Sequence, residues 1–206
     1  MDTWDAVKAE RTDLYELLAG LTPQQWDTQS LCSEWRVRDA VAHLIRGTQV
    51  KMGGFMVGMA RNGFNFNKSM AKDALAVGST PIEQVLADFQ SIISSQAKFP
   101  MATPLNVLTD TVVHQQDVRR PLGMARAVPE EQAIAVADGL KKTGFPFGTK
   151  KRIAGLRLTA TDADWSTGDG PEVSGSLEAL VMAMANRPAA LADLKGEGLD
   201  TLAARM

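Results

Sequence analysis

Residues 35–52, WRVRDAVAHLIRGTQVKM, decide the class of fold. Apolar side chains recur there at intervals of three and four residues, the spacing of one helical face, and the stripe includes Val37, Val41 and Leu44. The same spacing appears in four other segments, at about residues 2–20, 80–93, 104–119 and 129–142. These amphipathic segments predict a helical bundle over most of the chain before residue 145.

Capping residues and prolines mark where these helices begin and end. TPQQ at residues 22–25 and TPIE at residues 80–83 each place proline at the first helical position and predict a capping box. Pro121 predicts the end of the helix over residues 104–119. Glycines interrupt the helical pattern in residues 53–67, and we expect an irregular connection there, followed by a short helix.

The character of the sequence changes near residues 144–152, which we interpret as a linker. Beyond it, apolar and polar residues alternate over residues 156–161, which predicts a strand, and GDGP at residues 168–171 predicts a turn. Ser176 is placed to cap a further helix. We therefore expect a mainly α protein, with a helical domain at residues 1–148 and a small α+β domain at residues 149–206.

Composition excludes several classes of protein. The chain has 206 residues, of which 45% are apolar and 22% charged, so it buries about 70% of its unfolded surface without needing a disulfide or structural metal. A net charge of −2 argues against nucleic-acid binding through a basic face, and no apolar run reaches the ~20 residues of a membrane span. The acidic start does not resemble a secretory signal, and a single cysteine fits a reducing compartment. We expect a cytoplasmic protein without nucleic-acid or membrane partners, whose oligomeric state the sequence leaves open.

The two histidines, His43 and His114, are the main candidates for chemistry. Asp110 and His114 are four residues apart, so both project from one face of their predicted helix, and Asp117 extends the same line. Spacing alone favours a solvated polar face. The alternative is a divalent-metal site in which His43, from another helix, joins this carboxylate and imidazole and leaves positions open to activate water or a thiol.

Several runs of the sequence resemble a known family. LTPQQWD at residues 21–27 and SLCSEWRVRDAVAHL at residues 30–44 closely resemble the N-terminal part of the mycothiol-dependent maleylpyruvate isomerase family, which belongs to the wider DinB-like group. DTVVHQQDVRRPLG at residues 110–123 resembles the later metal motif of that family. Residues 155–161, GDGP and NRP at residues 186–188 are similar to its C-terminal extension.

The resemblance implies a DinB-like four-helix bundle that binds zinc or a similar divalent ion through three side chains, at His43, Asp110 and His114. The middle ligand is usually glutamate in this family, or histidine in DinB relatives, so Asp110 is a shorter arm. In enzymatic relatives the metal lowers the pKa of a low-molecular-weight thiol, and the thiolate attacks an electrophile. The expected activity is that of an isomerase or S-transferase acting on a small electrophile, with mycothiol as cosubstrate.

Three further residues carry expectations with an alternative each. Asp117 is a candidate for orienting His114, because metal-bound imidazoles usually donate their other N–H to an oxygen; an ion pair with a following arginine is the alternative. Arg187 is a candidate for binding a carboxylate of the thiol or substrate, or else for capping the preceding helix. Cys32 precedes the helix of His43, and a nucleophile is the alternative there; with no second cysteine and no nearby histidine in the sequence, we interpret it as a small buried hydrophobe.

Two choices stay open at the level of sequence. The same residues fit a non-catalytic metal- or ligand-binding bundle, because catalysis needs exchangeable coordination positions that spacing does not reveal. Nitrogen and oxygen ligands accept zinc, nickel and other divalent ions, so the resemblance favours zinc without excluding nickel. The sequence assigns no catalytic residue and does not identify the electrophile.

Overall fold

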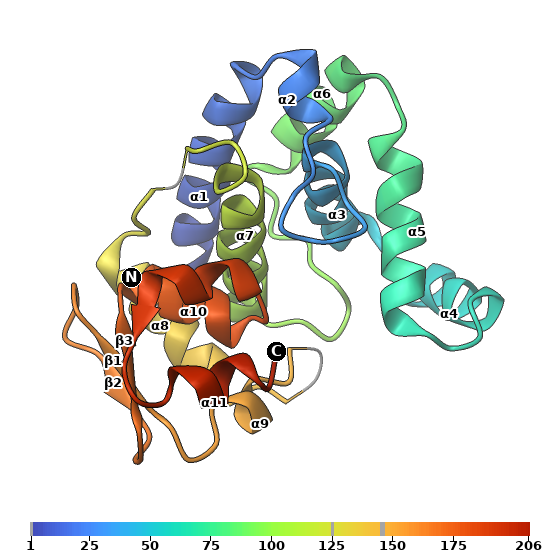
Figure 1. Cartoon of the computed structure of the whole chain (residues 1–206). Helices are drawn as coiled ribbons and strands as arrows, with labels where there is room; N and C mark the ends of the chain where they lie inside the picture. Colours follow the sequence, from blue (N-terminus) through green and yellow to red (C-terminus); the bar gives the residue numbers. More distant parts are fainter. Residues whose placement is uncertain (1, 125, 145–146) are drawn as a thin grey trace. The chain divides into compact units, whose positions relative to one another are not determined.

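The structure is a computed structural model that describes residues 2–124, 126–144 and 147–206. The chain divides into two compact units, Met1–Arg126 and Ala127–Met206. In the described residues the first unit is helical, and the second combines helices with a small sheet (Figure 1). The prediction of a mainly α protein with a small α+β unit at its C-terminal end is confirmed.

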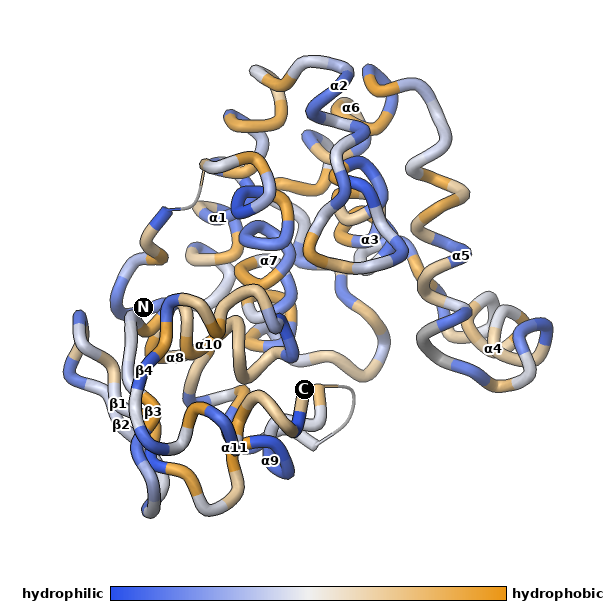
Figure 2. The backbone as a smooth tube through the Cα atoms, in the orientation of Figure 1, coloured by the Kyte–Doolittle hydropathy of each residue, from blue (hydrophilic) through white to orange (hydrophobic). Residues whose placement is uncertain are grey.

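The first unit contains a four-helix bundle. Its described helices are α1 (Thr3–Ala19), α2 (Pro23–Trp26), α3 (Val37–Gln49), α4 (Met52–Arg61), α5 (Phe66–Gly78), α6 (Ile82–Ile92) and α7 (Pro104–Arg119). Helices α1 and α3 each pack against both α6 and α7, which closes the bundle, and α5 packs on the outside of α3. Leu14, Ile45 and Phe89 fill the interior, and each is completely buried. Hydrophobic and hydrophilic residues are mixed along these helices (Figure 2).

Local signals at the helix starts explain most of these boundaries. The side chain of Asp2 accepts from the first backbone amides of α1, and Thr22 with Gln25 forms the predicted capping box of α2. Helix α7 covers the predicted range and has a capping box of its own. The box predicted at residues 80–83 is wrong, because the hydroxyl of Thr80 donates to the carbonyl of Val77 at the end of α5 instead.

The irregular connection expected at residues 53–67 is wrong in part, because α4 runs through the glycines at its start and middle. Glycine inside a helix costs only about 1 kcal/mol relative to alanine, and no proline interrupts this segment. A Cβ atom at Gly58 would lie 3.0 Å from the Oγ of Ser69 on α5, so glycine allows the two helices to approach there. Helix α5 then follows, as expected.

The second unit combines a small sheet with short helices. Its described elements are α8 (Glu130–Leu140), α9 (Thr149–Arg152), β1 (Arg157–Ala160), β2 (Ser166–Thr167), β3 (Glu172–Gly175), α10 (Leu177–Met184), the 3-10 helix η1 (Pro188–Asp193), β4 (Leu194–Lys195) and α11 (Leu199–Ala203). The strand order is β2-β1-β3-β4, and β1 and β3 run parallel while the outer pairs are antiparallel. Helix α10 packs against β1, β3 and α8.

The linker and the domain boundary expected around residue 148 differ from the structure. Residues 145 and 146 of that linker lie outside the described residues, but its last part is α9, and Thr149 is completely buried. The Thr149 hydroxyl and the Arg152 guanidinium both donate to the carbonyl oxygen of Met184, each at 2.8 Å. The boundary lies at Arg126 because α8 packs against α10 and so belongs to the second unit.

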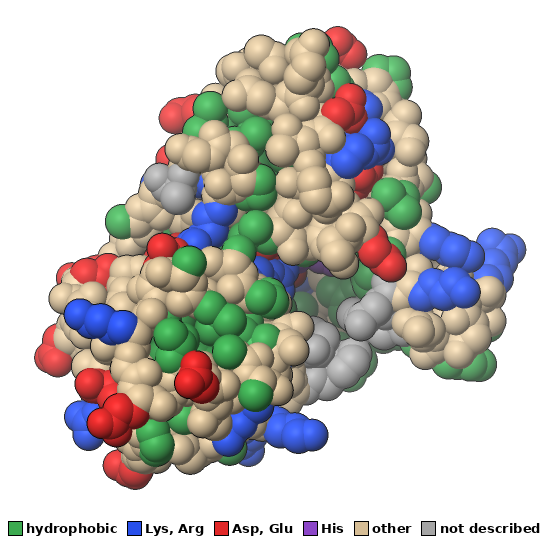
Figure 3. All heavy atoms as spheres, in the orientation of Figure 1, with side chains coloured by type: hydrophobic (Ala, Val, Ile, Leu, Met, Phe, Trp, Pro, Cys, Tyr) green, Lys and Arg blue, Asp and Glu red, His purple; other side chains and the backbone are tan. Residues whose placement is uncertain are grey.

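Within the described residues, no helix combines the length and the apolar character needed to cross a bilayer. The face of the molecule in Figure 3 carries side chains of both charges.

Candidate metal centre

Helices α3 and α7 bring together the three residues that the sequence singled out. The Oδ1 atom of Asp110 lies 3.6 Å from Nε2 of His43 and 3.4 Å from Nε2 of His114. One ligand atom from each of the three residues lies within 4.8 Å of the other two. The two imidazoles also contact each other, with ring centroids 4.7 Å apart. A carboxylate oxygen therefore lies close to both imidazole nitrogens.

The polar line on α7 is not the solvated face that spacing alone favoured. Helix α7 packs against both α1 and α3, so His114 is buried and Asp117 is completely buried. Asp110 and His43 keep side-chain exposures of 34% and 17%, which leaves one side of the group open to solvent. On the face drawn in Figure 3, only a small part of a histidine is visible. The group is therefore enclosed on the side of His114 and accessible beside Asp110.

The donor set fits a divalent cation. Two ligands on one tetrahedral zinc, each at about 2.0–2.1 Å, lie about 3.3–3.4 Å apart. The 3.4 and 3.6 Å separations around Asp110 are near this value and exceed the ~2.9 Å of an ordinary N–H···O hydrogen bond. The group contains three such donors among the described residues, whereas closed structural zinc sites usually have four. With three protein ligands and one side open to solvent, a bound ion would keep a coordination position for an exchangeable ligand.

Charges within the group shift two pKa values in opposite directions. Burial alone would raise the pKa of Asp110, but the charges of His43 and His114 outweigh it and lower this pKa. Burial alone would lower the pKa of His114, but Asp110, followed by contacts with Asp117 and Cys32, holds it well above the usual value. Each of the two shifts favours the charged form of its side chain.

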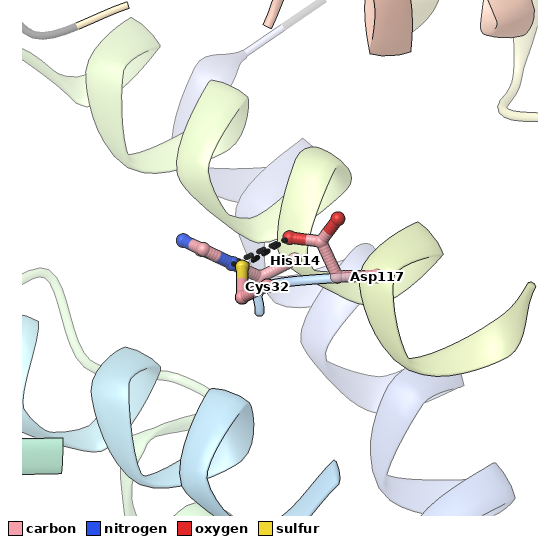
Figure 4. Close-up of side chains that lie close together, drawn as sticks. All are labelled: Cys32, His114 and Asp117. Carbon is pink, nitrogen blue, oxygen red and sulfur yellow. Dashed lines mark hydrogen bonds and ion pairs between the residues drawn. The ribbon is translucent and has the colours of Figure 1, made fainter. Parts of the chain in front are cut away.

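The loop of residues 28–36, between α2 and α3, packs against the imidazole rings of His43 and His114. The ring of Trp35 lies 4.8 Å from that of His43 and 5.6 Å from that of His114, measured between centroids. Cys32 of the same loop lies beside His114 and Asp117, which both come from α7 (Figure 4). Local sequence patterns do not predict this contact, because Cys32 and His114 are far apart along the chain. The interpretation of Cys32 as a simple hydrophobe is therefore wrong, since its sulfur makes polar contacts.

Space remains beside His43 on its own helix. A Cβ atom built at Gly47, one turn after His43, would meet nothing within 4 Å. Gly47 therefore borders open space one turn after His43 on α3.

Comparisons with known proteins bear on this arrangement. Residues 7–53 match the family model described as the mycothiol maleylpyruvate isomerase N-terminal domain. The matched residues include Cys32, Trp35 and His43, whereas Asp110 and His114 lie beyond them.

The whole chain has the fold of solved structures whose sequences are distant. A histidine-to-alanine mutant of the mycothiol-dependent maleylpyruvate isomerase superposes with a TM-score of 0.62 at 10% identity. A second crystal structure of that enzyme gives a TM-score of 0.58 at 12% identity. Each alignment covers 95% of this chain and 92% of the other. The DinB-like fold expected from the resemblance is confirmed, while no curated protein matches the sequence.

Two other candidates have definite partners. Nδ1 of His114 lies 2.9 Å from Oδ2 of Asp117, so the structure pairs Asp117 with the imidazole. Arg187 lies in the second unit, where its guanidinium donates to the carbonyl of Ala185 at the end of α10, 2.6 Å away. This contact is the one that the capping alternative for Arg187 requires.

Proposed function

We propose that this chain is a divalent-metal-dependent thiol enzyme, an isomerase or S-transferase that uses mycothiol as cosubstrate against a small electrophile. The observation that carries the proposal is the convergence of His43, Asp110 and His114 from two helices of the bundle. The match of residues 7–53 to the mycothiol maleylpyruvate isomerase N-terminal domain supports the choice of thiol.

His43, Asp110 and His114 would hold the ion. Zinc suits two imidazoles and a carboxylate, and nickel accepts the same ligands. The Asp110 oxygen lies near both nitrogens, which supports direct ligation despite the shorter arm of aspartate. A divalent cation held there would stabilise the thiolate form of mycothiol, which is the nucleophile of the proposed reaction.

The surrounding residues would orient the ligands and exclude water. Asp117 accepts a hydrogen bond from Nδ1 of His114. This contact directs the opposite ring nitrogen, Nε2, toward Asp110. The ring of Trp35 covers one side of the two imidazoles. Solvent and substrate would therefore reach the three ligands on the side of Asp110. Arg187 stays our candidate for binding a carboxylate of the thiol or substrate, in competition with its contact at the end of α10.

Consumption of mycothiol tests the proposal. Purified protein is measured as isolated, after treatment with a chelator, and after reloading with zinc, against electrophiles that include maleylpyruvate. We expect consumption that chelation abolishes and zinc restores, and that is lost in His43→Ala and His114→Ala. Gln49→Ala, an exposed position on α3, is the matched control and should keep full activity.

Two outcomes would contradict the proposal. Stoichiometric zinc without chelator-sensitive thiol consumption would favour the alternative, a non-catalytic metal- or ligand-binding bundle. Retention of stoichiometric metal by both histidine variants would remove the ligand assignment itself.

A further inference from the structure

Cys32 lies beside the ring nitrogen of His114 that is not directed at Asp110. Its Sγ atom is 3.2 Å from Oδ2 of Asp117 and 3.9 Å from Nδ1 of His114. The same carboxylate oxygen is 2.9 Å from that Nδ1 atom (Figure 4). One oxygen of Asp117 therefore accepts from both the imidazole and the thiol.

The protons in this group follow from what each atom can donate. A carboxylate only accepts, so the proton between Asp117 and His114 belongs to Nδ1. In the neutral imidazole, Nε2 then carries the free lone pair, and Nε2 is the atom that faces Asp110 and His43. The thiol of Cys32 donates to the same oxygen and so holds the carboxylate in the position that selects this tautomer.

The position of Cys32 is itself fixed by its loop. The amide of Cys32 donates to Oγ of Ser30 at 3.2 Å, and its carbonyl accepts from Nε2 of Gln29 at 2.7 Å. The amide of Leu31 donates to the backbone carbonyl of Asp117 at 3.1 Å, which ties the loop to α7 at the residue the thiol contacts. Backbone and side chain thus anchor Cys32 to the same turn of α7.

We propose that Cys32 is a positioning residue, whose thiol holds Asp117 so that His114 presents Nε2 to the metal ion. This role of Cys32 rests on the proposed function, because it requires His114 to be a ligand of the metal ion. Cys32, Asp117 and His114 could instead hold an ion of their own. The 2.9 Å contact argues against this, because it is the length of a hydrogen bond, and two ligands on a tetrahedral zinc lie about 3.3–3.4 Å apart.

Zinc affinity, measured by competition with a chromogenic chelator, tests the role of the thiol. Replacement of groups that orient a metal-bound histidine typically weakens metal affinity 10–100-fold, which we expect for Asp117→Asn. Cys32→Ala removes a weaker donor and should weaken binding about threefold to tenfold. Cys32→Ser keeps a donor in place and should stay within about twofold of the unmodified chain. A residue that only fills space would not distinguish serine from alanine in this way.

A double variant shows whether Cys32 acts through Asp117. In an Asp117→Asn background, Cys32→Ala should cause little further loss, because the carboxylate that transmits its effect is gone. Additive losses of zinc affinity in the double variant would overturn the proposal. Unchanged zinc affinity in Cys32→Ala would also overturn it, and so would equal losses of affinity in Cys32→Ala and Cys32→Ser. Two zinc ions per chain, one of them lost in Cys32→Ala, would replace it with a second metal site. Failure of the unmodified chain to bind zinc would overturn the proposed function as well. The failure of the proposed function is thereby distinguished from failure of the role proposed for Cys32.

Discussion

Replacing His43 with alanine separates metal binding from the stability of the bundle. At a zinc concentration one hundred times the dissociation constant, binding stabilises the native state by about 2.7 kcal/mol. For a chain of this size, each kcal/mol changes the melting temperature by about 2–4 °C. Zinc should therefore raise the melting temperature of the unmodified chain by about 5–10 °C.

The cost of the substitution in the absence of metal is smaller. His43 is partly exposed, and its ring contacts the rings of Trp35 and His114, with centroids 4.8 and 4.7 Å away. Loss of two ring pairs costs about 2 kcal/mol, so the metal-free variant should melt about 4–8 °C below the metal-free parent.

Thermal unfolding followed by circular dichroism at 222 nm, with zinc or with a chelator, measures both effects. His43→Ala should show this loss in chelator and no rise on adding zinc. Gln49→Ala, from the exposed surface of the same helix, should keep the whole rise. A full zinc-induced rise in His43→Ala would refute the assignment of this imidazole as a ligand, and so would no rise in the parent chain.

Three predictions concern packing and hydrogen bonds within the separate units. Gly78→Ala should destabilise the chain by about 1–3 kcal/mol in urea unfolding, because a Cβ atom there would overlap a buried carboxylate of α3. In Gly47→Ala the new Cβ atom meets nothing within 4 Å, so the urea midpoint should stay unchanged or rise. Equal losses of stability in Gly78→Ala and Gly47→Ala would contradict this account of the packing. Thr149→Val should cost about 1 kcal/mol, and Thr149→Ser less, since the buried hydroxyl donates to a carbonyl that keeps a second donor. Trp165→Phe removes a 3.1 Å hydrogen bond to Asp138 and should lower the urea midpoint, whereas Asp138→Asn, which keeps an acceptor, should lower it less.

Much of the fold follows from short-range signals. Helix α7 could be delimited because Pro104 fits its first turn and Pro121 prevents its continuation. The capping box at Thr22 is equally local. The box at Thr80 failed because its hydroxyl donates to the carbonyl of Val77, at the end of the preceding helix, and Pro81 takes the N-cap position of α6. Helix α4 was missed because several glycines lower helical propensity without forbidding a helix.

The candidate site could be predicted only in part, for a physical reason. Helical spacing places Asp110 and His114 on one face, but it does not say whether that face meets water or another helix. The burial of Asp117 depends on α7 packing between α1 and α3, which is a property of the whole bundle. The contacts of Cys32 and Trp35 with the imidazole of His114 join distant parts of the chain, and no local pattern encodes them.

The donors around Asp110 belong to helices that are not neighbours in the chain. His43 lies on α3, and Asp110 and His114 lie on α7, with three other helices between them. During synthesis, a nascent chain that has emerged as far as α6 carries a single imidazole of the three-residue group. The group can assemble only after α7 has left the ribosome and docked beside α3, so the ion would be acquired at a late step of maturation.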